Sequence, residues 1–337
     1  MKEERKAFMS IGIGAMLLLI MAFVSLFLGR YMVSPGMVFQ VIYHEITGRT
    51  LASVEQNIIW DIRLPRIMLN ILVGGGLAAA GVAFQGVFQN RLVSPDILGV
   101  SNGAGFGAAL GLLLGRLPPF GIAMMAFCGG LLSVGITYAI SKIRKGKSTL
   151  TLVLSGIVVS SFFGAMISYI KLVADTDSVL PSITYWLMGS FAGASYANVF
   201  FCATFIGLGL LVLHLLCWKI NILSMGDKEA YALGIDPEKN RMAIVIACTF
   251  ITATCVMATG IIGWIGMIMP NLCREFISAN NKYLLPAATI GGGLFMVVID
   301  LVARISTAAE IPIGILTAVI GAPIFIIVFF KQEGEMN

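Results

Sequence analysis

Charged residues are scarce in this chain of 337 residues. Only 12% are Asp, Glu, Lys or Arg, whereas 58% are hydrophobic, and soluble domains ordinarily contain about 25% charged residues. A soluble fold of this composition would lack the polar side chains needed to cover its surface. The scarcity therefore excludes a soluble protein and indicates one whose surface lies in lipid.

Histidine and closely paired cysteine are scarce as well. The chain has two histidines, His44 and His214, which lie far apart, and its six cysteines include no Cys-x-x-Cys pair. Zinc and haem sites need such ligands at suitable spacing. We therefore expect no metal site, no cofactor and no catalytic residues, and we interpret the cysteines as small packing residues. We also expect no nucleic-acid partner.

What the chain has instead is a series of apolar blocks of about the 20 residues that an α-helix needs to cross a bilayer. They lie near 9–28, 64–84, 96–115, 119–141, 149–172, 196–218, 242–262, 264–278, 284–304 and 312–330. The ten-residue alternating segments of a membrane β-barrel are not visible. The blocks predict an all-α integral membrane protein of about ten transmembrane helices, forming a single domain over residues 1–337.

Lysine and arginine indicate the orientation, because cytoplasmic loops of membrane proteins are enriched in both. They gather in "KEERK" at 2–6, in "SKIRKGK" at 141–147 and in the segment 219–241. This pattern predicts a cytoplasmic N-terminus (1–8), a cytoplasmic loop at about 221–241 and a cytoplasmic tail (331–337). An even number of spans agrees with both termini being on that side of the cell membrane.

Three arginines run against this charge bias. Arg63 and Arg66, in "RLPR", and Arg304 at the end of the ninth block all fall on the external side. A guanidinium stays charged, and burying it in lipid is costly. These side chains either extend to the lipid headgroups or face a partner. Asp300 is placed to pair with Arg304 on one helix, but Glu310 could hold Arg304 instead, and the sequence leaves both open.

Other features concern packing and the cytoplasmic side. Glycine clusters such as "GGG" at 74–76 and 291–293 are typical of helices that approach closely in lipid. In "DKEAYALG" (227–234), Ala230 and Leu233 form a small apolar face on a short helix that Gly234 would end. Such a helix either lies in the membrane interface or binds in a groove of another protein.

The fifth block carries serine and glycine. Gly156, Ser160 and Gly164 recur every four residues, and this spacing places them on one face of a helix. The face is a candidate lining for a translocation path. The alternative is that the serines bond to carbonyls of their own helix.

Several segments, in order along the chain, resemble one family of membrane proteins. They are "RLPR" (63–66), "GVAFQGVFQNRLVSPDILGVSNGAG" (81–105), "GIIGWIGMIMPNLCR" (260–274), "LLPAATIGGGLFMVVIDLVAR" (284–304) and "EIPIGILTAVIGAPIF" (310–325). The family is that of the iron-siderophore, haem and vitamin B12 uptake permeases (the FecCD type) of ABC importers. Gly226, Ala230, Leu233 and Gly234 also resemble the coupling segment of such permeases.

This resemblance implies a type II ABC importer permease with an inverted repeat, which is a transport subunit and not itself an enzyme. Its partners would be two ATP-binding subunits, a second permease subunit, an extracytoplasmic substrate-binding protein and membrane lipid. Arg63, Arg66 and Arg304 would contact the binding protein. Gly226, Asp227, Ala230, Leu233 and Gly234 would couple to the ATPase. The resemblance also places the fifth span, with Gly156, Ser160 and Gly164, beside the translocation path.

The cargo implied is an iron chelate, with a ferric siderophore first and haem or cobalamin as alternatives. Two positions depart from the family pattern: Arg91 replaces a proline, and Asn271 replaces a histidine. A secondary transporter is the alternative of a different class. It usually carries ionisable residues at mid-membrane, and the centres of these blocks have almost none.

Overall fold

The computed structural model describes residues 2–47, 53–143, 149–307 and 309–336, and every regular element in these residues is a helix. Each predicted block coincides with one helix, so the all-α expectation is confirmed. The ten helices are α1 (Lys2–Phe27), α4 (Leu64–Val87), α5 (Val100–Leu114), α6 (Pro119–Ile143), α7 (Thr149–Val173), α9 (Tyr196–Leu215), α12 (Pro237–Thr259), α13 (Ile265–Phe276), α14 (Asn281–Ser306) and α15 (Ile313–Met336). Residues 144–147 of the predicted basic loop, residue 1 and residue 337 lie outside the described residues.

Seven helices in the described part of the chain are long and apolar enough to cross a membrane, and three shorter apolar helices accompany them. One predicted block forms a helix of only 12 residues, α13. Its rise of about 18 Å is shorter than the ~30 Å hydrocarbon layer. The preceding residues 260–264 are not helical, so this block does not cross the membrane as one full helix.

Short helices that were not predicted as separate membrane-spanning blocks connect the long ones. They are α2 (Pro35–Ile46), α3 (Val54–Gln56), the π-helical η1 (Asn57–Arg63), the 3-10 helix η2 (Pro95–Leu98), α8 (Val179–Met188), α10 (Cys217–Leu223) and α11 (Asp227–Ala232). The segment 221–241 is therefore not an extended loop. It contains the end of α10, all of α11 and the first turn of α12.

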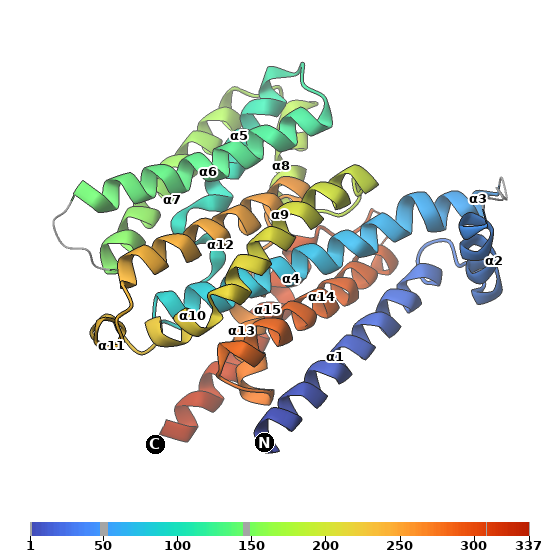
Figure 1. Ribbon diagram of the computed structural model, residues 1–337. Coiled ribbons are helices and arrows are strands. Elements are labelled where there is room, and N and C mark those ends of the chain that lie inside the picture. The colour runs from blue at the N-terminus through green and yellow to red at the C-terminus, as the bar shows by residue number, and fades with distance from the viewer. Residues whose placement is uncertain (1, 48–52, 144–148, 308, 337) are drawn as a thin grey trace.

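Helix α4 lies at the centre of the molecule. It packs against α14 and α13 on one side and against α9 and α12 on the other, while α5, α6 and α7 form a further layer and α1 covers α14 (Figure 1). Nearly every side chain of α4 from Val73 to Val87 is buried. Its run of glycine and alanine explains this position, because small residues let several neighbours approach at once.

The predicted packing role of the glycine clusters is confirmed where α4 crosses α14. A Cβ added to Gly74 would lie 2.3 Å from the carbonyl oxygen of Gly292, and one added to Gly292 would lie 2.3 Å from that of Gly74. Only a residue without a side chain fits at either position. The crossing fixes α14 against α4 and so sets the distance between residues further along both helices.

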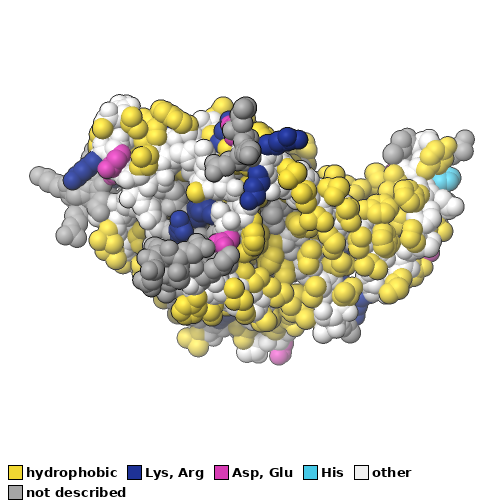
Figure 2. Space-filling view, turned by 90° about the horizontal axis from the view of Figure 1, so that it is seen from below, with side chains coloured by type: hydrophobic (Ala, Val, Ile, Leu, Met, Phe, Trp, Pro, Cys, Tyr) yellow, Lys and Arg dark blue, Asp and Glu magenta, His cyan; other side chains and the backbone are white. Residues whose placement is uncertain are grey.

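Both termini lie at one end of the molecule, together with α10, α11 and α13, and we name this the terminal end. The α2 end is the opposite one, where α2, α3 and the start of η1 lie (Figure 1). Helices α4 and α12 run in opposite directions. Figure 2, viewed from below Figure 1, shows dark blue Lys and Arg side chains in one region and an almost wholly yellow hydrophobic flank beside it.

Candidate functional site

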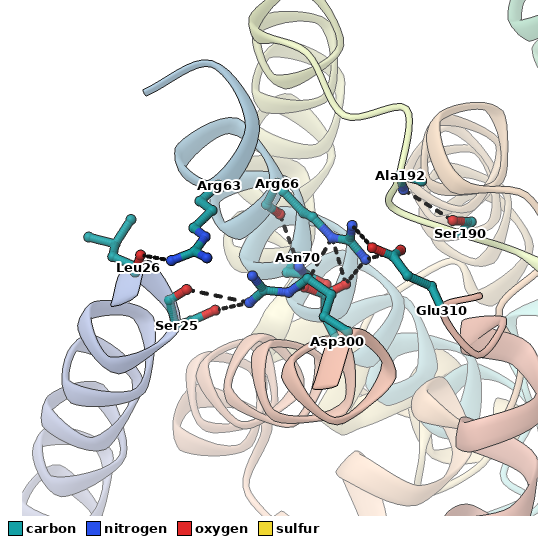
Figure 3. A network of polar contacts seen from close by, with 10 residues as sticks. Ser25, Leu26, Arg63, Arg66, Asn70, Ser190, Ala192, Asp300 and Glu310 are labelled. Carbon is teal, nitrogen blue, oxygen red and sulfur yellow. Dashed lines mark hydrogen bonds and ion pairs between the residues drawn. The ribbon is translucent and has the colours of Figure 1, made fainter. Parts of the chain in front are cut away.

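Arg66 lies at the α2 end, between two carboxylates that come from far along the chain. Its Nε donates to both carboxylate oxygens of Asp300 at 2.9 and 3.2 Å, and its Nη1 and Nη2 donate to Glu310 at 3.2 and 3.0 Å. Its Nη2 also lies 2.8 Å from Oδ1 of Asp300 as an ion-pair contact. The side chains of Arg66 and Asp300 are buried, whereas that of Glu310 is 32% exposed. Figure 3 shows the guanidinium held on both sides by these acids.

Arg304 and Arg63 complete the same network. Nε of Arg304 lies 3.1 Å from a carboxylate oxygen of Asp300, and its Nη2 donates to the hydroxyl of Ser25 in α1. Arg63 donates to the carbonyl of Leu26 in the last turn of α1 and to that of Tyr31 just beyond this helix. The network therefore joins α1, α4, α14 and the segment before α15.

These contacts settle two questions that the sequence left open. Arg304 pairs with Asp300 on its own helix, and Glu310 pairs with Arg66 instead of Arg304. All three arginines are buried within the protein, so they do not extend to the headgroups as snorkelling side chains. They lie together at one end, as predicted, but their N–H groups donate to residues of this same chain. The partner residues Ser25 and Leu26 were not foreseen, since they lie inside an ordinary apolar run.

The π-helical turn explains how Arg63 and Pro65 are accommodated. The helical chain begins at Val54, ahead of the predicted block at 64–84, and the N–H of Leu64 donates to the carbonyl of Ile59 across the π-turn. Pro65 has no N–H, so the carbonyl of Trp60 lacks the donor that the next π-turn would supply. The hydroxyl of Tyr196 donates to this carbonyl at 2.7 Å and satisfies it from α9.

At the terminal end, α11 is followed by the predicted glycine cap, but its apolar side chains do not form the predicted face. Gly234 has a φ of 74°, its N–H donates to Tyr231, and that of Ile235 donates to Ala230. This is the Schellman pattern that ends a helix at glycine. Ala230 is buried, whereas Leu233 is exposed, so the prediction that they share one face is wrong.

The exposed apolar side chains of this segment are not those of the predicted Ala230–Leu233 face. Met225, Tyr231 and Leu233 are 67%, 63% and 57% exposed, and we name these three side chains the α11 patch. Asp227 accepts from Arg241 at 2.6 Å, and this contact anchors α11 to α12. Gly226 precedes α11 with a φ of 135°, a conformation that favours glycine.

The stripe of small residues on α7 is divided between packing and open space. A Cβ on Gly156 would lie 2.2 Å from the carbonyl oxygen of Ile97 in η2, whereas one on Gly164 would meet nothing within 4 Å. The carbonyl of Ser160 accepts from Asn102. The neighbouring Ser155, Ser161 and Ser168 donate to carbonyls four residues earlier in α7, as the alternative interpretation expected for serines of this helix.

The two departures from the family pattern meet at the terminal end. Nδ2 of Asn271 donates to the carbonyl of Arg91 at 3.1 Å, so the residues link α13 to the turn that follows α4. In the described residues no cluster of three or more His, Cys, Asp or Glu side chains could hold a metal ion.

Comparisons with known proteins agree with this architecture. The profile of the FecCD transport family matches residues 17–331. The chain is 38% identical over 324 residues to the molybdate import system permease protein MolB of Haemophilus influenzae, covering 96% of each chain. It is 36% identical over 291 residues to a probable iron chelatin transport system permease protein of Helicobacter pylori, covering 86% of this chain and 87% of that one.

A solved structure is also closely similar. It is described as an inward-facing conformation of a putative metal-chelate type ABC transporter, and it has a TM-score of 0.86 and 37% identity. The match covers 95% of this chain and 98% of that one. With a fold this similar to that of the solved transporter and the family profile spanning residues 17–331, the chain belongs to the FecCD transport family of multi-pass ABC importer permeases.

Proposed function

We propose that this permease carries an iron chelate, a ferric siderophore first, across the cytoplasmic membrane into the cell. The observation that carries this proposal is the structural match at 37% identity to a transporter described as metal-chelate type. The Helicobacter pylori relatives named for iron chelatin support it. Energy would come from ATP hydrolysis on partner subunits, because the family consists of transport subunits.

Molybdate is a second candidate cargo. It is favoured by the relative of 38% identity that is named for molybdate import and that aligns over 96% of both chains. Other relatives are named for cobalamin and hemin, which keeps both as alternatives. These cargoes differ greatly in size and charge, so a direct uptake assay separates them.

The test of cargo is uptake into proteoliposomes that contain the permease with its ATPase and binding protein. Each labelled cargo is supplied in turn: a ferric siderophore, molybdate, cobalamin and haem. ATP-dependent accumulation of the ferric siderophore alone supports the proposal. Accumulation of molybdate with no uptake of iron contradicts it.

We infer that one of the two ATP-binding subunits docks at the terminal end of this chain, on the α11 patch, that the other docks on the second permease subunit, and that both termini therefore lie in the cytoplasm. Exposed apolar side chains on an otherwise polar segment are typical of a protein interface. Leu233 would contact the ATPase directly. The position of α11 would be held by Gly226, Asp227, Ala230 and Gly234.

We expect Leu233→Glu to abolish co-purification of the ATPase. The matched control is Leu117→Glu, on an exposed leucine between α5 and α6, which should leave the complex intact; equal effects of both would contradict the assignment.

We further propose that the α2 end receives the substrate-binding protein and that Arg63, Arg66 and Arg304 provide the positive charge that attracts it. Arg66 is the informative residue, because its partner Glu310 is partly exposed and could yield to an acidic group of the binding protein. Electrostatic complementarity of this kind acts chiefly on register and association rate.

The substitution Glu310→Gln tests docking while keeping the shape of the side chain. It should strengthen binding-protein association at low salt by freeing positive charge at Arg66. Asp61→Asn is the matched control, since Asp61 is an exposed acid near the same end that has no ion pair with Arg66. Association that is unchanged by Glu310→Gln, or equally strengthened by both, would count against docking at Arg66.

The path itself is proposed to pass the Ser160–Gly164 face of α7, with a second permease subunit facing it. Gly156 packs against η2 and would support the path from behind. Gly164 has room for a side chain, so Gly164→Leu should fold normally and reduce uptake by narrowing the path. Normal uptake by a folded Gly164→Leu permease would exclude this face.

A further inference from the structure

A polar pocket at the terminal end lies outside the network around Arg66. It has a volume of about 240 Å³, and its lining includes Gln85, Asn90, Arg91, Ser224, Arg274 and Asn281. Two of these side chains are guanidinium groups, several are amides, and no carboxylate is among the described residues that line the pocket. The lining is therefore positively charged.

Gln85 has a fixed orientation at the wall of this pocket. Its Nε2 donates to the carbonyls of Val93 and Met267, at 3.4 and 3.3 Å. The amide oxygen is consequently turned the other way, where it accepts from Nη1 of Arg274. Gln85 is itself buried, so it holds the guanidinium from inside the protein.

Asn271 holds the same nitrogen of Arg274. Its Nδ2 donates to the carbonyls of Arg91 and Met267, at 3.1 and 2.8 Å, and its Oδ1 accepts from Nη1 of Arg274 at 3.2 Å. Both amide oxygens thus bind one nitrogen of the guanidinium. A histidine at position 271 could not reproduce this pattern with a single ring.

The other edge of Arg274 has no partner of its own. Among the described residues, no hydrogen bond is made by its Nε or Nη2, and no carboxylate lies within ion-pair distance. The charge of Arg91 is near enough to repel that of Arg274. A partly buried positive charge without a counter-ion is costly. The Nε–Nη2 edge is one that binds a carboxylate or phosphate group through two parallel hydrogen bonds.

The volume limits what the pocket can hold. It exceeds the ~30 Å³ share of one water molecule several-fold, yet it lies below the ~300–1,000 Å³ of pockets for organic ligands. A small inorganic anion with its hydration water fits this range, whereas a siderophore, haem or cobalamin does not.

We propose that this pocket is a binding site for a small tetrahedral oxyanion, bound by the Nε–Nη2 edge of Arg274 with Arg91 contributing at the rim. The site does not depend on the cargo proposed above. Two sources of such an anion are distinguishable: an oxyanion leaving the translocation path, such as molybdate, or a cytosolic anion such as phosphate or sulfate.

The test is calorimetric titration of the purified full-length chain, in uncharged detergent, with molybdate, phosphate and sulfate in turn. We expect saturable binding that Arg274→Gln weakens about tenfold to a hundredfold, because charge-assisted hydrogen bonds are lost. Arg30→Gln is the matched control: it removes an exposed arginine elsewhere and should leave binding unchanged. Tighter binding of molybdate identifies an exiting anion, and equal or tighter binding of phosphate or sulfate identifies a cytosolic one.

The absence of saturable binding by any of the three anions would overturn the proposal, as would equal binding by the parent chain and Arg274→Gln. If Arg274→Gln does not fold, Arg91→Gln replaces it, since Arg91 is exposed. This variant should weaken binding several-fold, and unchanged binding by it would reject the site as described.

Discussion

Asp300→Asn is the substitution that most directly tests the arginine network. In the parent chain Asp300 is fully buried and accepts from Nε of Arg66 at 2.9 and 3.2 Å, while Nε of Arg304 lies 3.1 Å away. Arg66 keeps Glu310 after the substitution, but Arg304 keeps only Ser25. Removing one partner of a buried ion pair destabilises proteins by about 3–5 kcal/mol, and the remaining Glu310 contact places our expectation near ~3 kcal/mol.

The buried cysteines provide the assay. Cys202, Cys248 and Cys255 are at most 1% exposed, so a thiol-reactive fluorophore labels them only as the protein unfolds in detergent. A series of denaturant concentrations then gives the difference in free energy of unfolding between the variants.

Glu310→Gln is the matched control for Asp300→Asn. It removes a carboxylate from the same arginine, but the side chain of Glu310 is 32% exposed whereas that of Asp300 is fully buried, so the loss of stability should be smaller than that of Asp300→Asn. An equal loss of stability in the two variants, or an Asp300→Asn variant that unfolds like the parent chain, would contradict this role of Asp300.

Three further predictions concern single contacts. Tyr196→Phe removes the donor to the carbonyl of Trp60 beside Pro65, and should cost about 1–3 kcal/mol in the same unfolding assay; no loss would mean that water or another donor satisfies this carbonyl. Gly292→Leu should prevent α14 from packing on α4, so that size-exclusion chromatography shows no folded, monodisperse protein. The control is Gly135→Leu, which should be tolerated because a Cβ at Gly135 would meet nothing within 4 Å. Asp236 caps α12, and hydrogen bonds from backbone N–H groups, that of Lys239 foremost, lower the pKa of its carboxyl. Because this pKa is lower in the folded state, the capping stability is present above the ordinary Asp pKa and is lost as the pH falls through the lowered value. Protease cleavage near the α11–α12 turn should therefore increase on acidification, and an Asp236→Asn variant should show a smaller pH dependence.

Much of the fold was predictable because lipid imposes a simple requirement. An apolar segment in a bilayer must satisfy its own backbone hydrogen bonds, so each apolar block had to be a helix, and each block is one. The glycine contact between α4 and α14 was predictable in kind for a different reason, because small residues let helices approach closely in lipid. The short helices α2 and α8 were not, since at 12 and 10 residues they are shorter than the apolar length that crosses a bilayer.

The candidate site was harder to predict from the sequence. That Arg63, Arg66 and Arg304 gather at one end follows from topology, but the acids that hold Arg66 come 234 and 244 residues later. No local pattern reveals such a pairing. The π-turn is similarly hidden, because it depends on Pro65 and on a hydroxyl from α9.

The length of chain between Arg66 and its acids has a consequence for biogenesis. A ribosome releases α4 long before it has synthesised Asp300, so a newly inserted α4 carries a guanidinium whose counter-charges do not yet exist. Until α14 emerges, that group must remain in contact with water or lipid phosphate at the membrane surface. Helix α4 therefore reaches its final position late in assembly. In a chain truncated before residue 300, Arg66 should be accessible to aqueous reagents that cannot reach it in the complete permease.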